Sequence, residues 1–165
     1  MRTKHLLMVV LVVLFWTSGR AASPVDAAAA FDRLKTLVGE WEAQGGKAHL
    51  TYELTAGGTA LVERESGEKM PAMLTVYHRD KDRLLLTHYC MAGNQPRMEA
   101  RSFDPATREL RFEFVDATNL ADPKTGHMRS VRLRLVDDTH LATEWQFYEN
   151  GQPTFHETET YTRVK

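Results

Sequence analysis

The stretch Leu84–Met98, LLLTHYCMAGNQPRM, decides the fold. A strand-forming run leads into a turn and then into the start of a second strand, which is the pattern of a β-hairpin. With Arg83 pointing outward at the preceding turn, alternate side chains of the first strand point inward. The inward residues are then Leu84, Leu86, His88 and Cys90. The hairpin therefore predicts an inner wall that carries an imidazole and the only cysteine of the chain.

Short strand-like runs separated by turn residues fill the chain on both sides of this hairpin. The ten predicted strands are Gly39–Gln44, Ala48–Leu54, Ala60–Ser66, Ala72–His78, Arg83–Met91, Arg97–Phe103, Glu109–Val115, Met128–Val136, Leu141–Tyr148 and Thr154–Val164. Strands in meander order with no helical pattern between them favour a sheet that closes on itself, because closure removes exposed edges. We therefore predict an all-β domain over residues 39–165, an antiparallel up-and-down barrel of about ten strands.

Residues 1–22 have the organisation of a secretory signal peptide. Arg2 and Lys4 precede an apolar run over residues 6–16, and small residues around Ala21 and Ala22 offer a cleavage site. The apolar run is too short to cross a bilayer as an ordinary membrane helix. We expect a soluble exported protein, periplasmic or secreted, with no membrane span after cleavage.

Residues 23–38 predict a short helix that closes one end of the barrel. Asp26 is a possible N-cap residue. Apolar side chains recur along one face of the segment, at Phe31, Leu34, Leu37 and Val38.

Charge and cysteine content narrow the function classes. Without residues 1–22, which hold three basic residues and no acidic one, the chain keeps 18 basic and 22 acidic side chains. This balance argues against nucleic acid, which calls for a basic face. A single cysteine cannot close an internal disulfide. We expect a monomer whose partner is a small molecule.

The last two hairpins can be given a register. Asn150-Gly151 suits a two-residue turn, which would pair Glu149 with Gln152 and place Trp145 opposite His156. The turn Asp137-Asp138-Thr139 would pair Leu135 with Leu141. One inner face then collects Val131, Leu133, Leu135, Leu141, Thr143, Trp145 and His156. This register makes His156 an interior imidazole beside an indole.

The stretch Leu37–Gln44, LVGEWEAQ, resembles the first strand of calycin barrels: lipocalins, fatty-acid-binding proteins and nitrobindins. In those folds an arginine of the last strand covers a tryptophan of the first, and Trp41 and Arg163 are the matching pair here. The motifs THYCMAGNQPRM, FVDATNL and GHM are similar to those of an exported bacterial family of unknown function related to these barrels. Nitrobindins ligate haem through a histidine near the C-terminal strands. The resemblance therefore makes haem a possible cofactor, with His156 as the nearest counterpart of that ligand; no other cofactor is predicted.

His88 and Cys90 lie two residues apart on one strand and hence on one face. They are candidate catalytic residues, because an imidazole beside a thiol can activate a nucleophile, with Asn94 or Gln95 supplying a further donor. The alternative is that Cys90 packs as a small hydrophobe while His88 donates to a carbonyl.

Two loops are candidate parts of a barrel mouth. Asn94, Gln95 and Arg97 bring strong hydrogen-bonding groups to one turn, and the guanidinium suits a carboxylate or phosphate. The long connection from Asp116 to His127 has the length of a lid. The alternative in both cases is a solvated loop held by its own side chains.

Two further patterns have ordinary explanations. The alternating pairs Glu63/Glu65 and Glu157/Glu159 each share a face, where inward carboxyls would suit acid–base work, but solvated outer faces explain them more simply. No metal-binding spacing occurs in the sequence. Only a site assembled from His88, the metal candidate His156 and a carboxylate would hold zinc.

Three functions follow from these residues. The first is a binding barrel for a largely apolar ligand with a polar or anionic end. Its ligand-binding residues would be His88, Cys90, Asn94, Gln95, Arg97, Met98, Phe112, Phe114, Leu133, Trp145 and His156. The alternatives are an enzyme that uses Cys90 and His88, and a haem or metal carrier.

Overall fold

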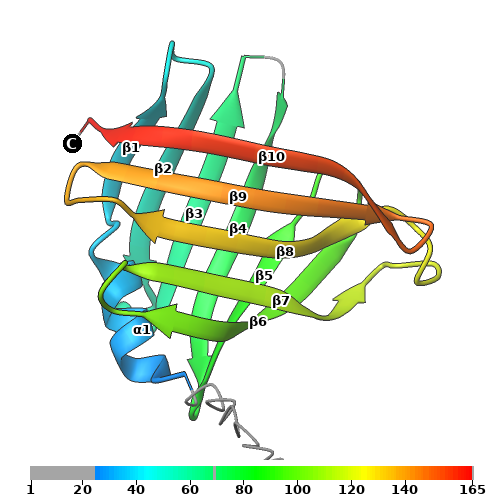
Figure 1. Cartoon of the computed structure of the whole chain (residues 1–165), viewed down its shortest axis with the longest axis horizontal. Coiled ribbons are helices and arrows are strands. Elements are labelled where there is room, and N and C mark those ends of the chain that lie inside the picture. The colour runs from blue at the N-terminus through cyan, green and yellow to red at the C-terminus, as the bar shows by residue number, and fades with distance from the viewer. Residues whose placement is uncertain (1–24, 69, 165) are drawn as a thin grey trace, which may run out of the picture.

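The computed structural model describes residues 25–68 and 70–164. Ten antiparallel strands follow one another around a closed barrel, and the last strand returns to the first (Figure 1). The all-β meander predicted from the sequence is confirmed. The proposed signal peptide, residues 1–22, lies outside the described residues. Within the described part of the chain, no helix is both long and apolar enough to cross a membrane.

The strands are bounded as follows. They are β1 Gly39–Ala43, β2 Ala48–Thr55, β3 Ala60–Gly67, β4 Met70–Asp80, β5 Arg83–Tyr89, β6 Gln95–Asp104, β7 Glu109–Thr118, β8 His127–Leu135, β9 His140–Glu149 and β10 Gln152–Arg163. A short 3-10 turn, η1 Ala56–Gly58, links β2 to β3.

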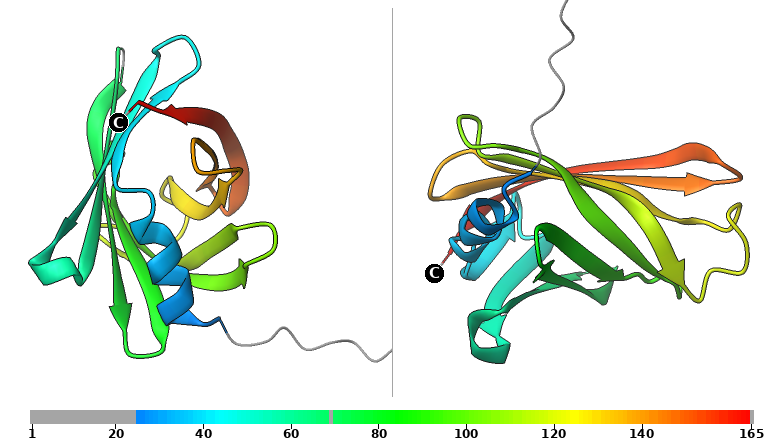
Figure 2. Two further views of the ribbon diagram at one scale, coloured as in Figure 1. Left: turned by 90° about the vertical axis from the view of Figure 1, so that its left-hand side faces the viewer. Right: turned by 90° about the horizontal axis from the view of Figure 1, so that it is seen from below.

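The helix α1, Ala27–Lys35, lies within the predicted segment and packs against β4 and β5 at one end of the barrel (Figure 2). Asp26 caps it, since its carboxylate accepts from the backbone N–H groups of Ala28 and Ala29 at 3.1 and 3.0 Å. The buried face of α1, at Ala27, Ala30, Phe31 and Leu34, joins the core of the barrel. We call the end of the barrel that α1 covers the helix end. The opposite end, where the turn between β9 and β10 lies, is called the open end.

At the helix end Arg163 of β10 covers Trp41 of β1. The guanidinium carbon lies 4.1 Å from the centroid of the indole, which is the arrangement that the resemblance to calycin barrels predicts. Arg163 also donates to the carbonyl oxygens of Thr36 and Val38, at 2.7 Å each. The pair therefore ties the last strand to the segment between α1 and β1.

The predicted register of the last hairpins is right at the turns and wrong at His156. Gln152 pairs with Glu149, Leu141 with Leu135, and Trp145 with Val131. A β-bulge between Pro153 and Phe155 then shifts β10 by one residue. Trp145 consequently pairs with Glu157, whereas His156 pairs with Gln146 and lies on the outer face.

Strand β1 is much shorter than β10, so the two strands pair over only part of β10. It pairs with β10 only from Trp41 to Ala43, opposite Tyr161 to Arg163. The part of β10 from Gln152 to Thr160 therefore continues beyond the end of β1 towards the open end (Figure 1). Inner side chains of that part, such as Glu157 and Glu159, are only half-buried.

Candidate functional site

A belt of polar side chains crosses the interior between the apolar helix end and the open end. It comes from strands on opposite sides of the barrel. Its members are Tyr52, Glu63, Glu65, Thr75, Tyr77, His88, Thr143, Glu157, Glu159 and Tyr161. Buried polar groups are costly unless they are hydrogen-bonded, so this belt lowers the stability of the barrel relative to an apolar lining.

His88 stands in the middle of this belt and is only 1% exposed. Its Nδ1 lies 3.0 Å from the Thr75 hydroxyl, and its ring lies 4.7 Å from the Trp145 ring across the interior. The Nε2 atom is buried and has no partner among the protein's own atoms. Desolvation lowers the pKa of His88 to about 4, so the imidazole is neutral at neutral pH.

Glu63 forms the deepest part of the belt and is 3% exposed. Its carboxyl accepts a hydrogen bond of 2.7 Å from the Tyr77 hydroxyl. Burial nevertheless raises the pKa of Glu63 above its ordinary value. The buried Tyr52 hydroxyl faces the same carboxyl and completes no hydrogen bond of ordinary geometry.

Glu65, Glu157 and Glu159 lie above Glu63 towards the open end. Glu65 is 6% exposed, and the Tyr161 hydroxyl lies 3.4 Å from its carboxylate across the barrel. Burial, helped by Glu63 and Glu157, raises the pKa of Glu65 to about 8. Burial also raises the pKa of Glu157. The expectation that these four glutamates lie on solvated outer faces is therefore wrong: Glu63 and Glu65 are buried, and Glu157 and Glu159 line the inner face of β10.

Cys90 follows β5 and is buried and unpaired. Burial raises the pKa of its thiol, and the negative charge of Glu65 raises it further. His88 directs its Nδ1 to Thr75 rather than to the thiol. An activated nucleophile needs a lowered thiol pKa, so this geometry favours packing over catalysis.

The polar turn between β5 and β6 holds the long β7–β8 loop in place. Asn94 is buried and donates from Nδ2 to the Gly126 carbonyl at 2.8 Å, while its Oδ1 has no partner. Gln95 accepts from the Thr118 hydroxyl at 2.7 Å. Asn119 donates to the Gly93 carbonyl at 2.5 Å. These contacts agree with the alternative prediction for both loops, in which hydrogen bonds of their own side chains hold them in place.

Arg97 lies on the outer face, where it is exposed. It forms a two-pronged ion pair with Asp116 of the neighbouring strand. This position corrects the expectation that Arg97 recognises an anionic ligand at the mouth, since the guanidinium points away from the interior and is already paired.

The predicted apolar wall is largely inside. Met98, Phe112, Leu133 and Trp145 are all buried. Phe114 is half-buried, and its ring lies 4.7 Å from the His127 ring. His127 is itself buried, with Nδ1 on the Thr125 carbonyl and an unpartnered Nε2. The wall therefore places a second buried imidazole near the open end.

His156 does not share the interior with His88. The side chain is exposed on the outer face, where Nε2 lies 2.7 Å from Glu144. The zinc site predicted from His156 and His88 together therefore does not form, and haem binding stays a prediction. In the described part of the chain, no group of three or more His, Cys, Asp or Glu side chains has the arrangement of a metal site.

Four interior residues are not among the predicted site residues: Tyr52, Thr75, Tyr77 and Tyr161. Alternation along β2 from the inward Leu50 turns Tyr52 inward. Leu86 pairs with Tyr77, so an inward Leu86 implies that Tyr77, and Thr75 two residues before it, also point inward. The signal was present but weak, since tyrosine and threonine suit both faces of a strand.

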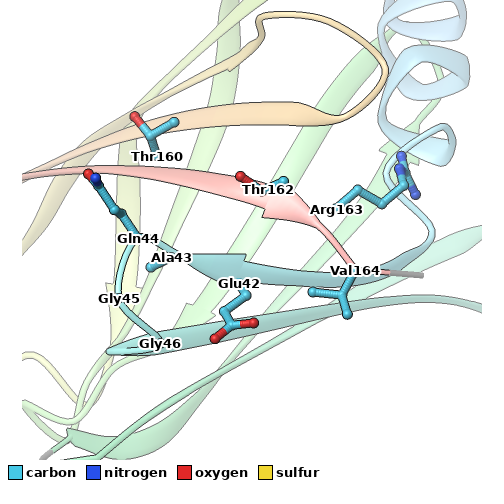
Figure 3. Close-up of a pocket in the computed structure, with 9 residues that line it drawn as sticks. All are labelled: Glu42, Ala43, Gln44, Gly45, Gly46, Thr160, Thr162, Arg163 and Val164. Carbon is cyan, nitrogen blue, oxygen red and sulfur yellow. The ribbon is translucent and has the colours of Figure 1, made fainter.

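A shallow hollow of about 690 Å³ lies on the outer wall, where β1 ends beside β10 (Figure 3). It is lined by Glu42, Gln44, Thr160, Thr162 and Val164, among others. Its only cationic side chain, Arg163, is committed to Trp41 and to backbone carbonyls. The hollow lacks the titratable cluster of the interior, so the candidate site is the polar belt.

The barrel is similar to a solved structure. The crystal structure of Rv2717c from M. tuberculosis aligns over 85% of this chain and 100% of that chain, with a TM-score of 0.57 and 16% sequence identity. At this identity the likeness concerns the fold alone. No protein-family model matches the chain. No curated protein sequence matches it either.

Proposed function

We propose that the protein is an exported binding protein that takes a small, largely apolar molecule into the barrel through the open end. The apolar body of the ligand would lie against Met98, Phe112 and Trp145, and its polar end would meet His88. Small barrels commonly bind ligands in this way.

The observation that supports this proposal most strongly is the buried Nε2 of His88. A neutral imidazole nitrogen that is 1% exposed and unpartnered costs stability, because burial removes its bonds to water. A ligand group that completes its hydrogen bond recovers that cost.

The proposal is tested by native mass spectrometry of the purified protein. A small molecule should co-purify with the wild type and be lost in His88→Phe, which fills the space and removes the polar group. His49→Phe is the matched control, because His49 is exposed on the outer face of β2. A co-purified molecule that survives His88→Phe unchanged, or wild-type protein that is free of any ligand and gains none from a cell extract, would contradict the proposal.

The enzyme alternative has less support. The raised pKa of the Cys90 thiol predicts slow alkylation by iodoacetamide at pH 7, about tenfold or more slower than glutathione. Fast alkylation below pH 7 would instead revive Cys90 as a nucleophile.

A further inference from the structure

We propose that the polar end of the ligand is an organic cation, an ammonium group bound by Glu65, Glu157 and Glu159 beside His88. This inference rests on the proposed function and names the chemical class of the ligand.

The first argument is the convergence of carboxyl groups on one space. Glu63 and Glu65 come from β3, while Glu157 and Glu159 come from β10 on the facing wall. The inward direction of the β10 pair follows from its register, since Glu157 pairs with the buried Trp145 and Glu159 with the buried Thr143. The contact between the Tyr161 hydroxyl and Glu65 shows that the two walls meet here.

The second argument is the missing counter-charge. The charged groups that act on Glu65 are the other three glutamates, Glu63, Glu157 and Glu159, all of the same sign. Over residues 25–68 and 70–164, no salt bridge involves any of these four carboxyls. The nearest inward-directed cation on β10, Arg163, is occupied at the helix end by Trp41 and carbonyl oxygens. A bound cation would supply the charge that the chain itself does not place here.

The third argument is independent of the acids and comes from His88. His88 Nδ1 is already engaged, because it lies 3.0 Å from the Thr75 hydroxyl. The buried Nε2 is the ring nitrogen that has no partner, and it accepts a hydrogen bond when the proton of the neutral imidazole is on Nδ1. The site therefore offers acceptors from both walls, which suits a ligand rich in donors.

The aromatic neighbours fit the same class. The Trp145 ring stacks against His88 at 4.7 Å and stands opposite Glu157 in the sheet. Indole faces attract cations, most strongly where water is excluded. Among the described residues no three His, Cys, Asp or Glu side chains stand close enough together to hold a metal ion, so the carboxyls surround a space that suits an organic cation better than a bare ion.

Binding of a cation should be linked to proton release. The groups that face Glu65 are Glu63, Glu157, Glu159, Tyr161 and Cys90. None of them supplies a positive charge, so Glu65 keeps its proton to about pH 8. An ammonium group favours the ionised carboxylate and displaces that proton. Affinity should therefore rise between pH 6 and pH 8.5.

The test compares three probes that have alkyl chains of similar length and differ in their polar group: octylammonium, octanol and octanoate. Binding is measured by calorimetry and by Trp145 fluorescence, with Trp145→Phe to identify the signal. At pH 8 we expect octylammonium to bind about tenfold or more tightly than either of the other probes. Calorimetry in two buffers of different ionisation enthalpy should show release of up to one proton.

The matched variants are Glu65→Gln and Glu159→Gln, which keep shape and remove charge. Each should reduce the preference for octylammonium to less than threefold, whereas Glu113→Gln, on the outer face beside Arg111, should leave it unchanged. Circular dichroism checks that each variant folds. If Glu65→Gln does not fold, Glu159→Gln replaces it in the test, because Glu159 is only half-buried.

The outcomes separate the two proposals. Equal or tighter binding of octanol or octanoate would overturn the cation and leave the binding barrel standing. Failure of all three probes to bind would also overturn the cation, and the co-purified molecule in native mass spectrometry would then decide on the barrel. Octylammonium binding that persists unchanged in both glutamine variants would place the cation elsewhere.

Discussion

The two ends of the barrel are built on opposite principles. The helix end is filled by apolar side chains and is sealed by α1 and by the Arg163–Trp41 contact. The polar belt and the open end beyond it hold buried carboxyls, phenols and imidazoles, several with unpartnered atoms. One wall of strands runs through both ends. The contrast teaches that apolar packing stabilises the helix end, whereas the polar lining beyond it contributes less to stability than an apolar lining would.

The largest expected difference between the two ends is in packing. Leu84→Ala removes a side chain that is 1% exposed next to α1, and should lower the free energy of unfolding by about 2–5 kcal/mol. Phe155→Ala, at the open end and 52% exposed, should lower it by less than about 1 kcal/mol. Urea denaturation measures both. Equal costs would break the division between the ends.

The next effect is the pH dependence that the open end imposes. The folded-state pKa of Glu65, about 8, lies above its unfolded value of 4.5, so stability is lost as pH rises between these values. His88, with a folded pKa of about 4 against 6.5, loses stability as pH falls and opposes Glu65 below pH 6.5. Between pH 6.5 and 8 the fall due to Glu65 should therefore be visible, at about 2 kcal/mol.

Glu65→Gln isolates this contribution. Unfolding free energies measured at pH 6.5 and pH 8 should differ less in the variant than in the wild type, while Glu113→Gln should keep the wild-type difference. A wild-type protein that becomes more stable over this interval would show that Glu65 is ionised in the folded barrel.

A smaller effect concerns the seal at the helix end. Arg163→Lys keeps the charge but loses the planar fork that reaches Thr36 and Val38, and should cost about 1–2 kcal/mol in thermal or urea unfolding. Arg134→Lys, on an exposed position of β8, should change stability by less than about 0.5 kcal/mol. An Arg163→Lys protein as stable as the wild type would mean that charge alone maintains the seal.

The smallest effect is at the N-cap of α1. Asp26→Ala removes the acceptor for two backbone N–H groups and should destabilise the protein by about 1 kcal/mol. Asp26→Asn retains an acceptor and should recover most of the loss. If both variants unfold at the same urea concentration as the wild type, α1 is held by its buried face alone.

The sequence predicts the barrel well because alternation and turn chemistry act locally. Asn150 and Gly151 both adopt the positive φ that a tight hairpin requires, and the pairing around the turn follows. The inner positions of His88 and Cys90 also follow from alternation, and both are buried.

The site was harder to predict because its evidence is not local. In β3, Leu61 and Val62 are both apolar, so alternation from one or the other turns Glu63 inward or outward. The inward direction of Glu63 and Glu65 depends on strands that come later in the chain, because Tyr77 donates a hydrogen bond to Glu63 and Tyr161 to Glu65. The bulge in β10 has no sequence signature as clear as that of its turn, and this is why His156 was placed on the wrong face.

The bulge between Pro153 and Phe155 decides which side chains of β10 point into the lumen. A two-residue turn and a strictly alternating strand would have presented His156, Thr158 and Thr160 to the lumen, giving a neutral or weakly basic lining. One additional residue in the strand exchanges that set for Glu157, Glu159 and Tyr161. Deletion of Thr154 would remove that additional residue and keep Glu157, Glu159 and Tyr161 facing the lumen. Straightening the bulge with every residue kept would instead turn these three side chains outward and take their acidic groups out of the lumen.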